Sequence, residues 1–358
     1  MPSLPSSGPF RGGVVAAVAT VAAWALFQLL GLPSPVLFGA LLGGMAGALT
    51  VSSPPTLPPP TFTAGQALVG ATIGGLVSPQ TLRGAFADWA PILAVTLGTL
   101  VLSVLAGQVL RVHRDVSATT GAFAMVAGGA SGMTALAHEL GADDRVVTVV
   151  QYLRVLLVLL AMPLVTATVF HPAAQQHGAA PSSASSPALG LLFTVVAVAV
   201  GLPLARVAHV PAGSLLGPLL VAVVLAVAGV FGTGGVPVPV QDLAYLLIGL
   251  QVGLRFTRDS LRSIARLLPL ALGLILALIA ACAGMGWVLS HAVGVAPLDA
   301  YLATTPGGLY AVLATAVDSG SDVTFVLATQ VVRLLVMLLA APVLAHVLRR
   351  RRPRPRRR

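Results

Sequence analysis

The stretch of sequence that decides the fold occurs twice in this chain. Residues 128–163 read GGASGMTALAHELGADDRVVTVVQYLRVLLVLLAMP, and residues 307–342 read GGLYAVLATAVDSGSDVTFVLATQVVRLLVMLLAAP. They align at a constant offset of 179 residues without a gap, and 14 of the 36 aligned positions are identical. The identical pairs include Gly128 and Gly307, Gly129 and Gly308, Asp143 and Asp322, Gln151 and Gln330, and Arg154 and Arg333. A repeat that keeps an arginine inside an apolar run indicates a duplicated membrane unit with two related polar sites.

The composition points to a membrane protein. Hydrophobic residues make up 57% of the 358 residues, charged residues only 8%, and the mean hydropathy is +0.96. A soluble domain carries about 25% charged residues. Apolar windows of about 20 residues, the length that crosses a bilayer as a helix, recur along the chain. The sequence lacks the short alternating segments of a β-barrel. We therefore expect an all-α integral membrane protein.

Two homologous halves of six apolar segments each account for most of the chain. The fifth and sixth segments are the repeated stretch and lie near residues 119–140 and 145–170, and again near 297–318 and 322–348. The resulting division is a cytoplasmic N-terminus at 1–12, a first membrane repeat at 13–170, an extracytoplasmic linker at 171–187, a second membrane repeat at 188–348, and an Arg-rich cytoplasmic tail at 349–358.

The arginines predict how many segments cross the membrane, because basic residues concentrate on the cytoplasmic side. All 20 basic residues are arginines. Twelve crossings would place several arginines outside. If the fifth segment of each half enters and returns on the same side, the second half is inverted, and 17 arginines lie inside against Arg83 outside. The remaining two, Arg154 and Arg333, lie within helices. This favours inverted repeats of five crossings plus one re-entrant or broken helix each.

The fifth segments contain residues that interrupt a helix. Residues 127–134 read AGGASGMT and residues 304–308 read TTPGG. Paired glycines and a proline break helices and free backbone groups, which the membrane tolerates only inside protein or beside a wet cavity. A kinked helix that still spans the membrane is the alternative.

The two intramembrane arginines are the strongest candidates for a site. A charged side chain at mid-bilayer costs about 2.5–3.5 kcal/mol, and such residues mark substrate or ion paths. Gln151 and Gln330 precede Arg154 and Arg333 by three residues, on the same helix face. We expect these four residues to bind a solute. The alternatives are a structural ion pair, an arginine that caps carbonyl groups, and an interhelical bond from each glutamine.

Glycines and carboxylates complete the predicted site. The turns at Gly128–Gly129 and Gly307–Gly308 are expected to present backbone N–H groups to an anion. Asp143, Asp322 and Glu139 are candidates for coupling to protons or sodium.

Neither a metal nor another cofactor is expected. Cys282 is the single cysteine, and the histidines are scattered rather than paired at ligand spacing. The Arg-rich tail follows an apolar helix directly, so it predicts attraction to anionic lipid rather than direct contact with nucleic acid. The sequence leaves open whether copies form a homo-oligomer.

The repeated motifs resemble those of the AbrB-duplication family of bacterial inner-membrane proteins. The resemblance rests on Gly128-Gly129, Gly141-Ala-Asp143, Val147, Arg154 and Pro163, and on Pro306-Gly307-Gly308, Gly320-Ser-Asp322, Val326, Arg333 and Pro342, and it covers about residues 13–348. The first turn departs from the family's Pro-Gly-Gly pattern, since Ala127 stands in place of proline. The resemblance implies a multi-pass protein of the inner membrane with both termini in the cytoplasm.

The family's labels and the residues suggest different functions. Members are often named ammonia monooxygenases or regulators of gene expression. A copper monooxygenase needs a His-rich metal site, which is absent from the sequence. A DNA-contacting regulator needs a DNA-binding module, and only the Arg tail could contact nucleic acid. We expect a secondary transporter of a small, anionic solute, not an enzyme. The alternative is a membrane sensor that acts indirectly on gene expression.

Overall fold

Long apolar helices make up most of the described chain in the computed structural model. The structure describes residues 8–51, 56–77, 79, 89–113, 116–128, 133, 137, 142–170, 187–209, 213–231, 235–263 and 265–350. Five helices among them are long and apolar enough to cross a membrane, at 11–29, 89–110, 145–170, 187–207 and 268–293. An integral membrane protein is consistent with these spans.

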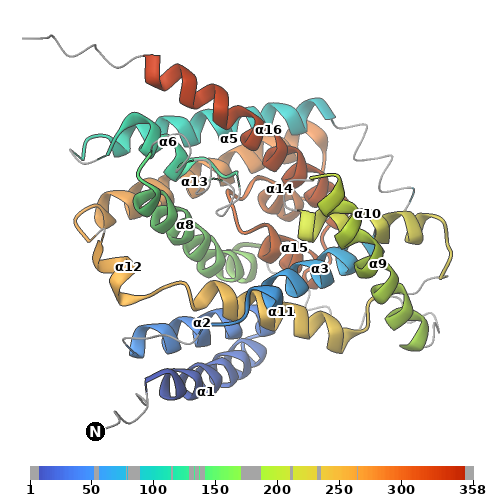
Figure 1. The fold of residues 1–358 in the computed structure, drawn as a ribbon. Helices are drawn as coiled ribbons and strands as arrows, with labels where there is room; N and C mark the ends of the chain where they lie inside the picture. Colours follow the sequence, from blue (N-terminus) through green and yellow to red (C-terminus); the bar gives the residue numbers. More distant parts are fainter. Residues whose placement is uncertain are drawn as a thin grey trace, which may run out of the picture. The chain divides into compact units, whose positions relative to one another are not determined.

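The helices follow the segments predicted from the sequence (Figure 1). In the first half they are α1 (Gly8–Leu29), α2 (Pro35–Thr50), α3 (Pro59–Gly75), α5 (Trp89–Leu110), α6 (Ala118–Met125) and α8 (Asp144–Val165), which continues as the π-helix η1 (Thr166–Phe170). In the second half they are α9 (Pro187–Val207), α10 (Gly213–Val227), α11 (Val238–Gly253), α12 (Arg258–Ser263), α13 (Leu268–Val293), α14 (Pro297–Thr304), α15 (Leu309–Asp318) and α16 (Val323–Arg350).

The fifth segment of the second half is broken where the sequence predicts a break. Helix α14 ends at Thr304 and α15 begins at Leu309. Between them Gly307 and Gly308 have φ angles of 123° and 70°, which side chains with a Cβ rarely adopt. In the first half α6 ends at Met125, and much of the segment that follows lies outside the described residues. The path of these segments through the bilayer, and the inversion of one half, stay predictions.

Contacts within the chain define two compact units, each built from both halves. Unit 1 comprises residues 1–87, 159–262 and 309–327, and unit 2 comprises residues 88–158, 263–308 and 328–358. Unit 1 therefore holds the first three helices of each half (α1, α2 and α3, and α9, α10 and α11) together with α15. Unit 2 holds the fourth segments, α6, α14 and most of α8 and α16.

Glycines let the helices of unit 1 approach closely in a reciprocal pattern. A Cβ at Gly70 or Gly74 of α3 would overlap the backbone of α10, and one at Gly249 or Gly253 of α11 would overlap the backbone of α2. Gly70 and Gly249 are also 179 residues apart. The third segment of each half thus packs on the second segment of the other half, through small residues that bring two backbones together.

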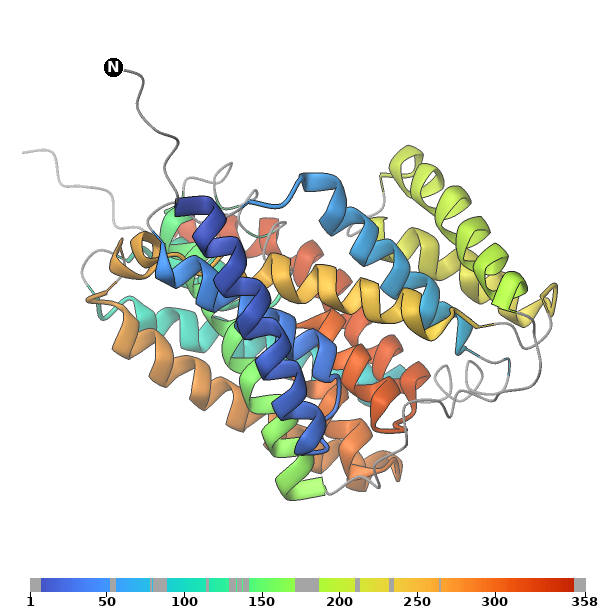
Figure 2. The same cartoon turned by 90° about the horizontal axis from the view of Figure 1, so that it is seen from below.

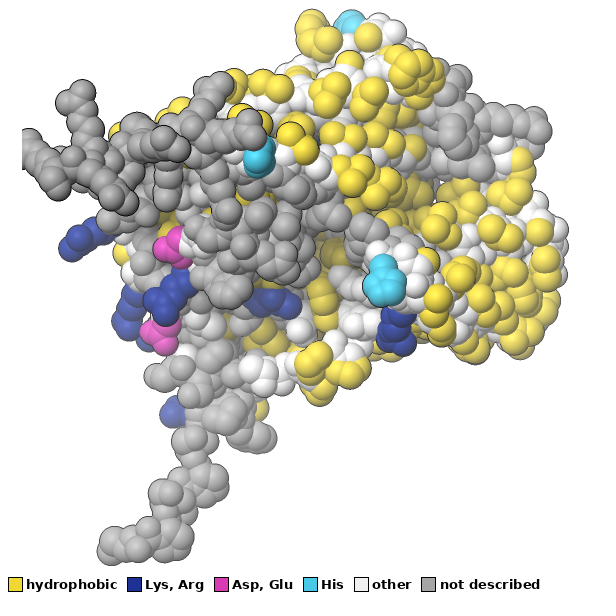
Figure 3. Space-filling view, turned by 45° about the horizontal axis from the view of Figure 1, so that its top comes forward, with side chains coloured by type: hydrophobic (Ala, Val, Ile, Leu, Met, Phe, Trp, Pro, Cys, Tyr) yellow, Lys and Arg dark blue, Asp and Glu magenta, His cyan; other side chains and the backbone are white. Residues whose placement is uncertain are grey.

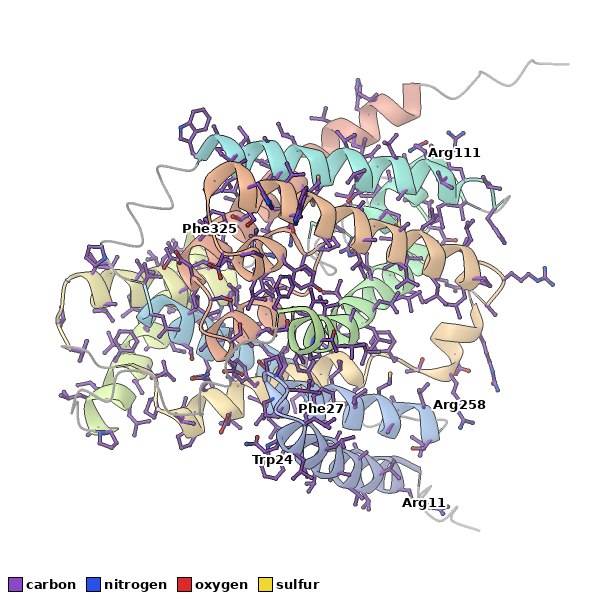
Figure 4. The ribbon with its side chains drawn as sticks, turned by 180° about the vertical axis from the view of Figure 1, so that it is seen from behind. Arg11, Trp24, Phe27, Arg111, Arg258 and Phe325 are labelled. Atoms are coloured by element: carbon purple, nitrogen blue, oxygen red, sulfur yellow. The ribbon has the colours of Figure 1, made fainter. Side chains whose placement is uncertain are left out.

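The first hairpin of unit 1 brings two arginines to one end. Helices α1 and α2 pack side by side (Figure 2), with Gly47 of α2 against the backbone of Gly12. Arg11 lies at that end of α1, and Arg258 donates from Nε to the carbonyl of Leu49 near the end of α2 (Figure 4). The predicted topology requires Arg11 and Arg258 to share one side of the membrane, and their placement agrees with that.

The core of unit 2 is bordered by α5 and α13, which bury equivalent faces. The buried positions of α5 recur in α13 at the repeat offset of 179, so that Thr96, Thr99, Ser103 and Gly107 correspond to Ile275, Leu278, Cys282 and Gly286. The other face of α5 carries exposed Leu97, Val101 and Leu105. Hydrophobic side chains also cover much of the face drawn in Figure 3. Such a surface is suited to contact with lipid.

Candidate functional site

Arg154 lies buried in unit 2, where it caps the end of a short helix. Its Nη1 donates to the carbonyl of Met125, the last residue of α6, at 2.8 Å. Its Nη2 donates to Oε1 of Gln151 at 2.7 Å. The Gln151 amide in turn donates to the carbonyls of Phe123 and Val126, each at 2.7 Å. The last carbonyls of a helix have no partner within it, and this pair supplies the donors.

Arg333 and Gln330 make the same arrangement at the end of α14. The Gln330 amide donates to the carbonyls of Leu302, Ala303 and Thr305 at 2.8, 3.3 and 3.4 Å. Arg333 donates from Nη2 to Gln330 and from Nη1 to the carbonyls of Thr305 and, at 3.5 Å, Thr304. Phe123, Met125 and Val126 correspond to Leu302, Thr304 and Thr305 at the repeat offset. The duplication therefore preserves a network as well as residues.

The network corresponds to two alternatives named from the sequence: arginines that cap carbonyls and glutamines that bond between helices. It does not explain why the donors are charged. A helix C-terminus carries only about half a negative charge, and a neutral donor could satisfy a carbonyl. The binding role predicted for the four side chains is separate from this capping role and stays a prediction.

The two guanidinium groups are buried, and no carboxylate of the described residues bonds to them. Arg154 is 2% exposed and Arg333 is 3% exposed. In the described part of the chain, every hydrogen-bond partner of both groups is a carbonyl or an amide oxygen. Carboxylates are the usual partners of an arginine within a membrane helix, and none accepts from these two groups among the described residues.

Each arginine keeps one buried donor that no described group accepts. Nε of Arg154 and Nε of Arg333 are both buried without a hydrogen-bond partner among the described residues. An unpaired buried donor costs about 1–3 kcal/mol, more for a charged group. Buried polar atoms of this kind call for water, an ion or a ligand.

One of the two predicted glycine turns borders an arginine. A Cβ on Gly307 would lie 3.2 Å from Nε of Arg154 and 3.6 Å from its Nη2. Gly307 belongs to the second half and Arg154 to the first, so one half lines the guanidinium of the other. Gly128 is buried and donates to the carbonyl of Val126 at 3.1 Å. Gly129 lies outside the described residues.

The predicted coupling aspartates serve as helix N-caps. Oδ1 of Asp143 accepts from the backbone N–H groups of Arg145 and Val146 at 3.0 and 3.2 Å, at the start of α8. Oδ1 of Asp322 accepts from Thr324 and Phe325, each at 3.0 Å, at the start of α16. Both aspartates are exposed, and capping is their ordinary use. Their coupling role stays a prediction. Glu139 lies outside the described residues.

Sequence reasoning did not single out Asp318 as a site residue, although it occupies the position of Glu139 in the repeat. Asp318 is half-buried at the end of α15 in unit 1, and its Oδ2 accepts from Ser34 Oγ at 2.8 Å. Ser34 adopts a left-handed conformation, with φ at 52° and ψ at 49°. A carboxylate is disfavoured at the negative end of a helix. The signal that could have found Asp318 is its acidic partner at the same repeat position.

No group of three or more His, Cys, Asp or Glu side chains that could hold a metal occurs among the described residues. Cys282 is buried in one core cluster with Met125 and Val126. The described residues therefore offer two guanidinium groups and two amides at this site, with a thiol in the adjoining core.

Comparisons with known proteins agree with the resemblance noted from the sequence. The family described as "Transition state regulatory protein AbrB" matches residues 37–349. The chain is 35% identical to "Putative regulator AbrB" of Escherichia coli (strain K12) over 324 residues, which cover 89% of this chain and 91% of that protein. It is 25% identical to "Uncharacterized protein YhjN" of Bacillus subtilis (strain 168) over 291 residues, 78% of this chain and 76% of that one. The chain belongs to the AbrB family.

Proposed function

We propose that this protein is a secondary transporter of a small anionic solute, which binds at Arg154 and Arg333. One observation carries the proposal: two buried guanidinium groups, related by the repeat, retain unpaired Nε donors and have no carboxylate partner in the described chain. A solute with a negative charge would supply the missing acceptors. The repeat favours transport, since repeated halves around broken helices are a common design of secondary transporters.

The proposed site uses the predicted residues in distinct ways. Arg154 and Arg333 attract the anion through their Nε edges. Gln151 and Gln330 hold the guanidinium planes in place, so that they position the site rather than bind. Gly307 leaves room at the edge of Arg154, and we infer the same role for Gly128 and Gly129 at Arg333. The protein would lie in the bacterial inner membrane with both termini in the cytoplasm, and its Arg-rich tail would contact anionic lipid.

A membrane sensor is the second candidate. The description of the family and the printed name of the Escherichia coli relative both refer to regulation. A sensor would bind the same anion at the same arginines but would move none across the membrane. Neither relative's printed name describes an enzyme, and we propose no catalytic activity.

Binding is tested by a thermal-shift screen of the detergent-purified protein against small carboxylates, amino acids, phosphate and ammonium. A ligand at about 100 times its dissociation constant adds roughly 2.7 kcal/mol to the free energy of unfolding. We expect an anion to give this stabilisation and ammonium to give none. Stabilisation by ammonium alone, or by no member of the panel, would contradict the proposal.

Two kinds of variant separate binding from folding. The double variant Arg154→Gln, Arg333→Gln removes both charges but also weakens the helix caps. Arg333→Lys keeps the charge and one capping donor but loses the planar fork and Nε. Both should lose the response to the anion, and Arg333→Lys should still elute as a folded species in gel filtration. Wild-type binding in both variants would show that the arginines do not hold the solute.

A further inference from the structure

Helix α5 presents three hydroxyl groups along its buried face. Thr96, Thr99 and Ser103 are 1%, 1% and 0% exposed. They follow one another at spacings of three and four residues, so they line one side of the helix. The opposite side of α5 is apolar and exposed. A hydroxyl stripe inside a membrane helix therefore faces the interior of unit 2.

Only one of these hydroxyls is satisfied by its own helix. Thr99 Oγ1 donates to the carbonyl of Thr96 at 2.8 Å, the bond that Ser and Thr side chains ordinarily make in apolar helices. Thr96 Oγ1 and Ser103 Oγ are buried without any partner among the described residues. Two unpaired hydroxyls on one face call for an acceptor or donor from outside the described residues.

The repeat relates Ser103 to the arginine site. Its counterpart on α13 is Cys282, which belongs to the same buried core cluster as Met125 and Val126, whose carbonyls accept from Arg154 and Gln151. One turn further along α13, a Cβ at Gly286 would overlap Thr304, whose carbonyl accepts from Arg333. One turn beyond Ser103, Gly107 packs against Gly121 of α6 in the same way. The position of Ser103 relative to the end of α6 is therefore equivalent to the position of Cys282 relative to the end of α14.

The two faces differ in chemistry although their positions correspond. Thr96, Thr99 and Ser103 on α5 are replaced by Ile275, Leu278 and Cys282 on α13. One half therefore contributes hydroxyl groups and the other contributes hydrocarbon and a thiol. A ligand held by both arginines would meet a polar wall on one side and an apolar wall on the other.

We propose that Ser103 is a further ligand contact of the arginine site and that it selects a small carboxylate carrying a hydroxyl group. The carboxylate binds the guanidinium groups, the ligand's hydroxyl bonds to Ser103 of α5, and its hydrocarbon lies against α13. This assignment rests on the proposed function and deepens it. It is specific to the first half, because the hydroxyls have no counterpart in the second.

The single native cysteine gives a test that needs no knowledge of the solute. The exchange Ser103→Cys, Cys282→Ser moves the only thiol to the equivalent position on α5. We expect the anionic reagent 2-sulfonatoethyl methanethiosulfonate to label it at least about tenfold faster than the trimethylammonioethyl analogue, after each rate is divided by that for a free thiol. Val101→Cys, Cys282→Ser, which places the thiol on the exposed apolar face, should not react. Failure of position 103 to react, or a rate ratio that does not favour the anion, would overturn the assignment.

The ligand class is tested with lactate and propionate, which differ by one hydroxyl. Lactate should stabilise the wild-type protein more than propionate does. Ser103→Ala should weaken lactate binding about tenfold, equivalent to about 1.4 kcal/mol, without changing the response to propionate. Thr99→Val is the matched control, since its hydroxyl is already satisfied. Equal responses to the two acids, a response to neither, or an unchanged response in Ser103→Ala would overturn the class. The proposed function would stand in each case if another anion binds and depends on the arginines.

Discussion

At the residue scale, Arg154 and Arg333 show two features that involve different atoms. Their Nη atoms cap the carbonyls at the ends of α6 and α14, whereas each Nε is buried without an acceptor among the described residues. Capping explains why each site has a hydrogen-bond donor. Only the unpaired Nε of each arginine calls for a ligand. A charged side chain at the centre of a membrane helix costs about 2.5–3.5 kcal/mol, which a neutral cap would avoid.

Gly307 is the residue whose replacement tests this geometry most locally. Gly307→Ala places a Cβ 3.2 Å from Nε of Arg154 and forces alanine to a φ of 123°. Such strain costs about 1–3 kcal/mol. We expect a lower melting temperature in detergent and a weaker response to the anion.

Gly273→Ala is the control for that substitution. Gly273 lies in α13, and a Cβ there would meet nothing within 4 Å. Since alanine favours a helix over glycine, this variant should be as stable as the wild type or slightly more so. If Gly307→Ala behaves like Gly273→Ala, the turn does not lie against the guanidinium.

Some residues of the site could be predicted from the sequence, and others could not. The repeated Arg154 and Arg333 are conspicuous because charge is rare in an apolar run. Asp143 and Asp322 cap helices, as an aspartate directly before a helix is expected to do, and their coupling role stays a prediction. The sequence gives no signal for Ser103, the further contact that we propose, because hydroxyls in apolar helices usually bond to their own backbone, as Thr99 does.

At the element scale, the breaks follow from composition, whereas the partners of each helix do not. Pro306, Gly307 and Gly308 cannot all continue a helix, so the end of α14 was predictable. The packing of α3 on α10 and of α11 on α2 joins segments from different halves. The hydropathy pattern predicts where each helix lies in the chain, but it does not predict which other helix that helix packs against.

The glycine pairs of α3 and α11 should contribute equally to stability if the packing is reciprocal. Gly70→Ala and Gly249→Ala each place a Cβ inside the van der Waals radius of a backbone carbonyl, that of Leu215 and of Leu37 respectively. Overpacking of this kind costs about 1–3 kcal/mol. Thermal unfolding in detergent should show similar losses for both variants. A large loss in one and none in the other would contradict the reciprocal arrangement.

At the scale of the whole molecule, the break between α14 and α15 coincides with a boundary between the two units. Helix α14 belongs to unit 2, with Arg333 and Gln330, whereas α15 belongs to unit 1, with Ser34 and Asp318. Each unit also draws helices from both halves. The two halves are thus repeats in the sequence, whereas each compact unit combines helices from both halves. The order of the segments in the sequence does not predict this division.

The inverted arrangement predicts a specific topology. A reporter that is active only outside the cytoplasm should be active when fused within residues 171–187 and silent when fused within residues 258–266. Arg11 and Arg258 lie at the same end of the α1–α2 hairpin, as this topology requires. The opposite pattern of activity would remove the argument for inversion.

Flux of the anion identified by thermal shift into proteoliposomes tests the central claim most directly. The protein is reconstituted as wild type, as Arg333→Lys and as Gly273→Ala, with equal incorporation verified by gel. The account predicts uptake by wild type and by Gly273→Ala, and at least a tenfold lower rate for Arg333→Lys. Saturable binding without any uptake would identify a sensor instead, and uptake that is unchanged in Arg333→Lys would contradict the placement of the solute at the arginines.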